Sequence, residues 1–262
     1  MAPPTNAELA VNRRSRARIG VVVPVSNSNL EQDMFLLKPK DVSVHFARAG
    51  GYDLDATPDS DQMRRFALAS LDDTIAALAA VKPDVILYGC TSATLAHGPA
   101  FDAQFSEAIR QRAGVPAVTA AAALVEALEY LQVWRIAFSS PYVEALNREA
   151  IAFLAECGVT TVSQAYVGAD LGNYGQGALT PEDVYDLGRR ADHPDAEALV
   201  LSCTDMRAVE AIESLERDLG KPVITSNQAM MFCAATRLGL EMSSIPSFGR
   251  LLASEEKSRM AS

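Results

Sequence analysis

The sequence of 262 residues is poor in the side chains that usually hold metal ions or disulfide frameworks. It has three histidines, at positions 45, 97 and 193, and four cysteines, at positions 90, 157, 203 and 233. None of these residues forms a CxxC pair or another spacing typical of metal ligands. We therefore expect no metal site, and in a reducing compartment the four cysteines are expected to be free thiols.

Positive charge and long apolar segments are also scarce. The chain has 23 Lys and Arg residues against 33 Asp and Glu residues, a net charge of -10. A nucleic acid backbone requires concentrated positive charge, so we expect no nucleic acid partner. No apolar run reaches the length of about 20 residues that spans a bilayer, and residues 1–17 lack the order of a signal peptide. We expect a flexible tail over residues 1–17, no membrane contact and a cytoplasmic location.

Strand and helix patterns alternate along the rest of the chain. Strands are predicted at residues 18–25, 42–48, 84–88, 135–138, 160–166, 198–201 and 222–225. Helices are predicted at residues 60–80, 99–113, 141–157, 181–191 and 206–219. This alternation, with short connections, indicates an α/β fold with mostly parallel sheets flanked by helices.

The second half of the chain repeats the first in three places, in the same order. The matched segments are residues 18–24 with 135–141, 85–91 with 198–204, and 114–119 with 220–225. Three matches in register predict two pseudo-symmetric lobes. We place the first lobe at 18–133, the second at 134–240 and a C-terminal segment at 241–262. The chain can cross between such lobes, so these boundaries are approximate.

Cys90 and Cys203 occupy equivalent positions in this repeat, each at the end of an apolar strand and before a predicted helix. Ligands of parallel sheets lie beyond the carboxyl ends of the strands, and pockets often form between lobes. The sequence therefore predicts an active site at the lobe interface, with the two thiols facing each other across a substrate.

Two such thiols could perform acid–base or covalent chemistry. A helix N-terminus and the neighbouring Thr91 or Thr204 favour the thiolate, so we expect pKa values below the free value of about 8.5. A thiolate can add to an electron-poor carbon or remove a proton next to a carboxylate, without metal or organic cofactor. Cysteine more often fills a protein core, and this is the role that we expect for Cys157 and Cys233.

Small polar residues follow several strands and could form a carboxylate cradle of hydroxyl and N–H groups. They lie at residues 24–29, 139–142, 171–175 and 225–228. Turns and helix caps use the same residue types, so each segment alone is ambiguous. Asp205, directly after Cys203 and Thr204, is either an acid of the site or a residue that starts a helix; we favour the second interpretation.

These motifs resemble maleate cis–trans isomerases, within the aspartate/glutamate racemase superfamily that also includes arylmalonate decarboxylases. The resemblance covers about residues 17 to 240. It rests on residues 23–31, 88–93, 140–142, 172–173, 202–205 and 225–229, whose order and spacing both fit.

The resemblance implies that Cys90 is a nucleophile and Cys203 a proton donor and acceptor. It implies a small carboxylate substrate and no cofactor. The residues expected to hold the substrate are Ser26, Asn27, Thr91, Ser92, Ala93, Tyr142, Asn173, Thr204 and Asp205. In isomerase chemistry of this kind, the thiolate adds to the double bond of maleate, the resulting single bond rotates, and expulsion of the thiolate gives fumarate.

The chain departs from the isomerase pattern in two places. Ser28 and Asn29 replace two threonines, and Asp205 stands where asparagine is more familiar. A carboxylate beside Cys203 would repel a dianion or bind an amino group, so a two-cysteine amino-acid racemase or epimerase is the alternative. A decarboxylase, which keeps one cysteine of the two, and a non-catalytic binding protein for small acids are less favoured. We also expect a homodimer or a larger homo-oligomer.

Overall fold

The computed structural model describes residues 16–69 and 71–253. The tail predicted over residues 1–17 lies almost wholly outside the described residues, as do residues 254–262 of the predicted C-terminal segment. The first strand begins at Ala17, one residue before its predicted start.

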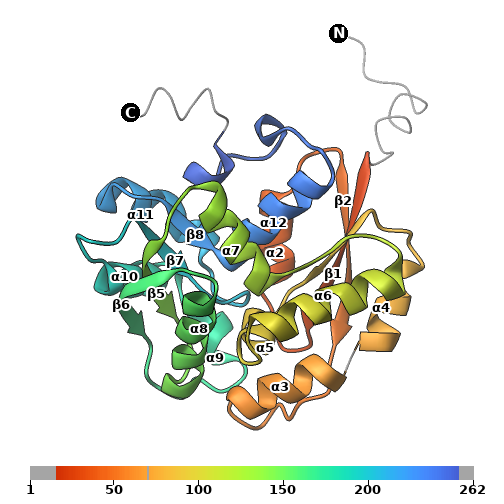
Figure 1. Cartoon of the computed structure of the whole chain (residues 1–262), viewed down its shortest axis with the longest axis horizontal. Coiled ribbons are helices and arrows are strands. Elements are labelled where there is room, and N and C mark those ends of the chain that lie inside the picture. Colours follow the sequence, from red (N-terminus) through yellow and green to blue (C-terminus); the bar gives the residue numbers. More distant parts are fainter. Residues whose placement is uncertain (1–15, 70, 254–262) are drawn as a thin grey trace.

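Eight strands form two separate sheets with the same topology. The first sheet has the order β2-β1-β3-β4, and the second has the order β6-β5-β7-β8. The strands are β1 (Ala17–Pro24), β2 (Val42–Ala49), β3 (Val85–Tyr88), β4 (Ala117–Thr119), β5 (Arg135–Ser140), β6 (Thr160–Tyr166), β7 (Ala198–Leu201) and β8 (Val223–Thr225). All of the strand pairings are parallel. The predicted α/β fold with two pseudo-symmetric lobes is therefore confirmed (Figure 1).

Helices connect the strands and cover both sheets. They are α2 (Leu30–Leu37), α3 (Ser60–Ala69), α4 (Leu71–Ala79), α5 (Thr91–Leu95), α6 (Pro99–Ala113), α7 (Ala120–Tyr130), α8 (Glu144–Glu156), α9 (Gly175–Ala178), α10 (Pro181–Ala191), α11 (Ile212–Leu219) and α12 (Ser226–Arg237). Short 3-10 turns lie at η1 (Val209–Ala211), η2 (Met242–Ser244) and η3 (Arg250–Leu252).

Three helix predictions differ from the structure. The helix predicted at 141–157 begins only at Glu144, so Tyr142 lies in the loop before it. Residues 60–80 were predicted as one helix but form α3 and α4. The helix predicted at 206–219 becomes regular only at Ile212, because a turn and η1 precede it. This difference affects the active site, since the segment after Cys203 is a turn and not a helix.

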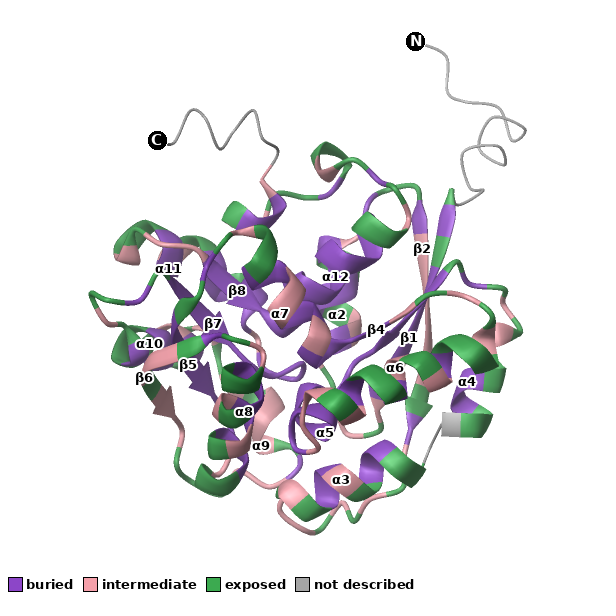
Figure 2. Cartoon of the chain, viewed as in Figure 1, coloured by how far each residue is buried: buried purple, intermediate pink, exposed green. Residues whose placement is uncertain are grey.

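The central strands are apolar because helices cover both faces of each sheet. Every residue of β3 and β7 is buried, as is nearly all of β1 and β5. Figure 2 shows this buried layer in each lobe, with the exposed residues on the outer surfaces of the helices. The ends of these rigid strands hold the residues that follow them.

Helix α12 ties the two lobes together. It follows β8 of the second sheet, yet it packs along α7 and also contacts α2, β3 and β4 of the first half (Figure 1). Residues 226–235 are all buried, so this helix is enclosed on every side. The lobe boundaries at residues 133 and 240 stay predictions, because the structure shows a chain that crosses between the lobes.

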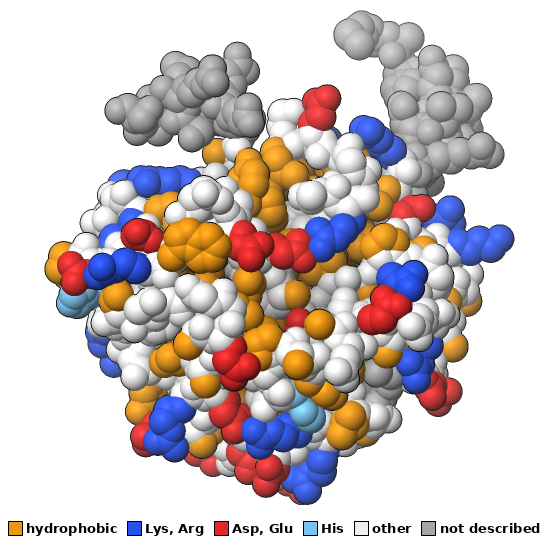
Figure 3. Space-filling model, viewed as in Figure 1, with side chains coloured by type: hydrophobic (Ala, Val, Ile, Leu, Met, Phe, Trp, Pro, Cys, Tyr) orange, Lys and Arg blue, Asp and Glu red, His pale blue; other side chains and the backbone are white. Residues whose placement is uncertain are grey.

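The described surface carries mixed charge. On the face shown in Figure 3, Lys and Arg side chains alternate with Asp and Glu side chains. None of the helices formed by residues 16–69 and 71–253 is both long enough and apolar enough to cross a membrane.

Gly89 brings the end of β3 close to its neighbours. Its N–H donates to the carbonyl of Val22 at 2.9 Å. A Cβ atom at this position would lie 2.2 Å from Cδ2 of Leu30 and 2.6 Å from the Val22 oxygen. The backbone can therefore pass between β1 and α2 only where no side chain is present, directly before Cys90.

We expect Gly89→Ala to destabilise the fold by about 3 kcal/mol or more, because a backbone oxygen cannot move aside as a flexible side chain can. Gly50→Ala is the matched control, since a Cβ atom at Gly50 would meet no atom within 4 Å. Urea unfolding of both variants measures the difference. Equal stabilities would show that the close approach at Gly89 is not required.

Candidate active site

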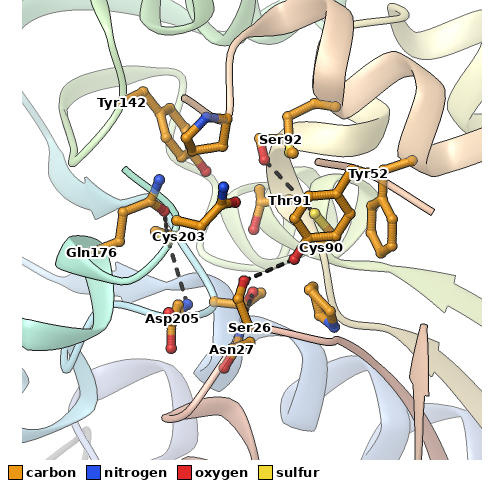
Figure 4. Close-up of a pocket in the computed structure, with 16 residues that line it drawn as sticks. Ser26, Asn27, Tyr52, Cys90, Thr91, Ser92, Tyr142, Gln176, Cys203 and Asp205 are labelled. Atoms are coloured by element: carbon orange, nitrogen blue, oxygen red, sulfur yellow. Dashed lines mark hydrogen bonds between the residues drawn. The ribbon is translucent and has the colours of Figure 1, made fainter. Parts of the chain in front are cut away.

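A small cavity lies between the lobes, beyond the carboxyl ends of the strands (Figure 4). Its volume is about 50 Å³. Ten predicted site residues line it: Ser26, Asn27, Cys90, Thr91, Ser92, Tyr142, Asn173, Cys203, Thr204 and Asp205. Ala93 does not line it; this residue is buried, and its backbone N–H bonds to the Cys90 thiol.

Six further residues line the cavity that the sequence interpretation missed: Pro24, Tyr52, Pro58, Met63, Phe66 and Gln176. Pro24 belongs to the polar segment at 24–29 and Gln176 directly follows the one at 171–175, so their position could have indicated a role. The other four come from α3 and the loop before it, for which the second half showed no matching segment. They form an apolar wall, with Tyr52 and Phe66 in edge-to-face contact at 5.0 Å.

Cys90 lies directly after β3 and caps the N-terminus of α5. Its sulfur is 3.7 Å from Oγ of Ser92 and also bonds to the backbone N–H groups of Ser92 and Ala93. Burial nevertheless raises the pKa of the Cys90 thiol to about 11, and these hydrogen bonds offset only part of the rise. The predicted pKa below 8.5 is thus wrong, because loss of solvent outweighs the donors.

Cys203 lies directly after β7 and is also buried. Its thiol donates to Oε1 of Gln176 at 3.3 Å, and its sulfur accepts the N–H of Asp205 at 3.4 Å. Burial, followed by the charge of Asp205, raises the pKa of Cys203 far above its usual range. The expected helix dipole is missing here, since the residues after Cys203 form a turn.

Asp205 does not start a helix of its own, contrary to the interpretation that we favoured. Its Oδ1 accepts the backbone N–H groups of Ser28 at 2.8 Å and Asn29 at 3.1 Å, at the N-terminus of α2. Nδ2 of Asn29 donates to the Asp205 carbonyl at 2.6 Å. The carboxylate therefore caps a helix of the other lobe, and the two departures from the isomerase pattern contact each other. Burial raises the pKa of Asp205 to about 6.

Thr204 and Asn27 join the two cysteine segments. Oγ1 of Thr204 donates to the carbonyl of Gly89 at 2.8 Å and accepts Nδ2 of Asn27 at 3.1 Å. Oδ1 of Asn27 accepts the N–H of Leu30 at 2.9 Å. The two bonds of Thr204 cross the lobe interface and fix the position of one cysteine relative to the other.

Tyr142 reaches the cavity from the loop after β5. Its hydroxyl lies 3.2 Å from Oγ of Ser202. Burial raises the pKa of Tyr142 well above its ordinary value, and negative charge on Cys203 or Cys90 would raise it further. The hydroxyl therefore stays protonated near both sulfur atoms and can donate to an anion.

Asn173 holds a loop of the first lobe. Its Nδ2 donates to the carbonyls of Asp53, Leu54 and Ala56 at 3.2, 2.9 and 2.6 Å. Both amide hydrogens are thus engaged, so a substrate carboxylate would have to displace these carbonyls to bind them.

The cavity offers neutral donors for a negative charge. Among the sixteen described residues that line it, none is Lys, Arg or His. Hydroxyl groups, amides and backbone N–H groups are therefore the groups available for an anion. Over residues 16–69 and 71–253, no cluster of His, Cys, Asp and Glu side chains could hold a metal ion.

A buried carboxyl group is linked through Asn227 to the turn that follows Cys203. Asp33 of α2 is only 3% exposed, and its Oδ2 accepts Nδ2 of Asn227 at 2.7 Å. The same nitrogen donates to the carbonyl of Thr204 at 3.0 Å. Burial raises the pKa of Asp33 to about 7.

This raised pKa predicts that the protein loses stability as the pH rises from about 4 to about 7. In this window the folded chain keeps a proton on Asp33 that the unfolded chain has released, and the shift from 3.8 corresponds to roughly 4 kcal/mol. Asp205, with a raised pKa, acts in the same direction.

Asp33→Asn should remove a large part of this loss while keeping an oxygen for Asn227. Thermal melts or urea unfolding between pH 4.5 and 8 measure it, with Asp73→Asn on the surface of α4 as the control. A pH dependence as steep in Asp33→Asn as in the wild type would contradict the assignment.

Comparison with known proteins gives consistent matches. The family model for arylmalonate decarboxylase matches residues 19–252. A maleate isomerase of Nocardia farcinica is 30% identical over 246 residues, covering 90% of this chain and 95% of the relative. An arylmalonate decarboxylase of Bordetella bronchiseptica is 31% identical over 163 residues, covering 62% of this chain and 68% of the relative.

A solved structure with a similar fold carries a covalent adduct. It is a mutant of the Nocardia farcinica maleate cis–trans isomerase with a covalently bound succinylcysteine intermediate. Its TM-score to this chain is 0.83, with 27% sequence identity, 90% of this chain covered and 98% of that chain.

Proposed function

Because the chain belongs to the arylmalonate decarboxylase family, we propose that it is a cofactor-independent isomerase of the maleate-to-fumarate type within that family. The observation that carries the proposal is the pair of buried thiols, Cys90 and Cys203, from equivalent strand ends on one cavity. The relative with a succinylcysteine intermediate supports a covalent route, because addition of a cysteine to maleate produces this group.

In the proposed reaction, the Cys90 thiolate adds to one alkene carbon and forms a sulfur–carbon bond. The electron pair of the double bond moves to the neighbouring carbon, with its charge delocalised into the adjoining carboxylate, and Cys203 can deliver a proton to that carbon. The bond between the two carbons is then single and rotates. Return of the proton to Cys203 and cleavage of the sulfur–carbon bond give the trans product and restore the Cys90 thiolate.

Neutral donors would stabilise the charge that develops during addition. Thr91 and Ser92 lie beside Cys90, and the protonated hydroxyl of Tyr142 lies near both sulfur atoms. Fixed dipoles that line a cavity stabilise such charge at little reorganisation cost. Ser26, Asn27 and Thr204 complete the proposed set of substrate contacts from the two lobes, and Asn173 positions the loop that closes the cavity.

The racemase alternative would have to use a carboxylate that already caps α2 with one of its two oxygens. An amino acid would need a free acceptor for its ammonium group, and Asp205 was the candidate. Oδ1 of Asp205 already accepts hydrogen bonds from Ser28 and Asn29.

Decarboxylation of a substituted malonate is the second candidate. The apolar wall of Pro58, Met63 and Phe66 could accept an aryl group, and the family model points in the same direction.

The cytoplasmic location and the homo-oligomeric state stay predictions.

Purified enzyme with maleate in D₂O should produce the proton NMR signal of fumarate without added metal or cofactor.

Cys90→Ala should abolish turnover and leave the melting temperature near that of the wild type, because the change removes one sulfur atom. Cys157→Ser is the control, since Cys157 ends α8 and does not line the cavity. Turnover by Cys90→Ala would exclude the covalent mechanism; carbon dioxide release from an arylmalonate, with maleate intact, would favour the decarboxylase.

Cys203→Ser should lower kcat by about a thousandfold, the usual scale for loss of a positioned acid or base. Because this variant still has the nucleophile, it should accumulate an adduct of maleate on Cys90. Intact mass spectrometry and peptide mapping would detect the added mass. Wild-type turnover in this variant would remove Cys203 from the mechanism.

A further inference from the structure

Each of the two cysteines is followed by a threonine, but the next residue differs between the two lobes. The repeat aligns Cys90-Thr91-Ser92 with Cys203-Thr204-Asp205. The third position is therefore a hydroxyl in the first lobe and a carboxyl group in the second. Two thiols at equivalent strand ends thus have neighbours of opposite effect.

Around Cys90 the neighbouring groups donate to sulfur. The Ser92 hydroxyl lies 3.7 Å from Sγ, and the backbone N–H groups of Ser92 and Ala93 bond to the same atom. Donors to sulfur stabilise the negative form of a thiol. This environment suits a residue that must become a nucleophile.

Cys203 also accepts backbone N–H groups, from Asp205 at 3.4 Å and from Met206, so such donors do not distinguish the two thiols. The difference lies in the remaining neighbours, which favour a proton on the Cys203 sulfur. Its thiol donates to Oε1 of Gln176 at 3.3 Å, and this interaction exists only while the thiol is protonated. The Asp205 carboxylate is held beside the same segment by Ser28 and Asn29. Gly177 leaves room for this carboxylate, because a Cβ atom there would lie 2.9 Å from Oδ2 of Asp205.

We propose that the residue two positions after each cysteine assigns its role: Ser92 prepares Cys90 as the nucleophile, and Asp205 acts as a positioning residue that keeps Cys203 protonated as the acid. This inference rests on the proposed function and assigns the asymmetry of its two thiols to one pair of residues.

The charges that face Asp205 leave its effect on Cys203 intact. Asp33 of α2 and Tyr52 of the loop after β2 are acidic groups in the field of Asp205, and Cys90 is an acidic group in the field of Cys203, so none of them neutralises the carboxylate. Arg207 pairs with Glu210 at 2.7 Å. In agreement, the pKa of Cys90 rises to about 11, and Asp205 is the second cause, after burial, of the larger rise at Cys203.

Alkylation by iodoacetamide tests the proposal without substrate, with each modified cysteine assigned by peptide mass. In a Cys90→Ser background, Asp205→Asn should increase the alkylation rate of Cys203 at pH 8 about tenfold or more, because one pKa unit changes the thiolate fraction tenfold. Asp205→Ser, which gives the second lobe the residues of the first, should act in the same direction. Melting temperatures verify that each variant is folded.

The reciprocal change tests the first lobe. In a Cys203→Ser background, Ser92→Asp should slow alkylation of Cys90 by a similar factor, and Ser92→Ala should slow it less. The proposal would be overturned if folded Asp205→Asn and Asp205→Ser variants alkylated Cys203 no faster than the Cys90→Ser parent. This would hold even if the wild type isomerised maleate. Faster alkylation without maleate turnover would support the proposal and contradict the proposed substrate.

Discussion

Burial of two thiols in one small cavity, with no cationic side chain in its lining, is the constraint on which the site depends. Removing a thiolate from water is costly, and two adjacent thiolates would also repel each other. The cavity can therefore hold one negative sulfur at a time, with the second as its proton partner. The hydrogen-bond donors to the Cys90 sulfur agree with this limit, because they favour a thiolate there. The acceptor for the Cys203 thiol and the carboxylate of Asp205 agree with it too, because they favour a proton on Cys203.

The same constraint explains why the lobe interface is tied by hydrogen bonds to the backbone. Thr204 binds the carbonyl of Gly89, Asn27 binds Thr204, and Asp205 caps α2. Each bond joins the segment of one cysteine to the other lobe, so the relative position of the sulfur atoms does not depend on long flexible side chains. Predicted polar residues thus contribute to the site partly by positioning, and Asn173 uses both of its amide hydrogens for a loop.

The repeat in the sequence predicted the strands, the two lobes and the cavity at their interface, because strand-end residues of parallel sheets meet at one edge. It could not predict the apolar wall, since Met63 and Phe66 come from a segment without a counterpart in the second half. Helix α7 was hard to recognise because little of its surface faces solvent, so it has no clear apolar stripe. In α12, which is buried more fully, a helical run was predicted only over residues 229–238. The pKa values depend on burial, and the partner of Asp205 lies more than 170 residues away along the chain.

Helix α12 has a consequence for the order in which the protein can fold. The first sheet and α7 are complete by residue 130, but the helix that covers α7 and contacts α2 ends at Arg237. During synthesis from the N-terminus, the apolar face of the first lobe therefore stays uncovered until nearly the whole chain has left the ribosome. The late arrival of α12 leaves the apolar face of the nascent first lobe in contact with water for most of synthesis, which is the period in which aggregation competes with folding.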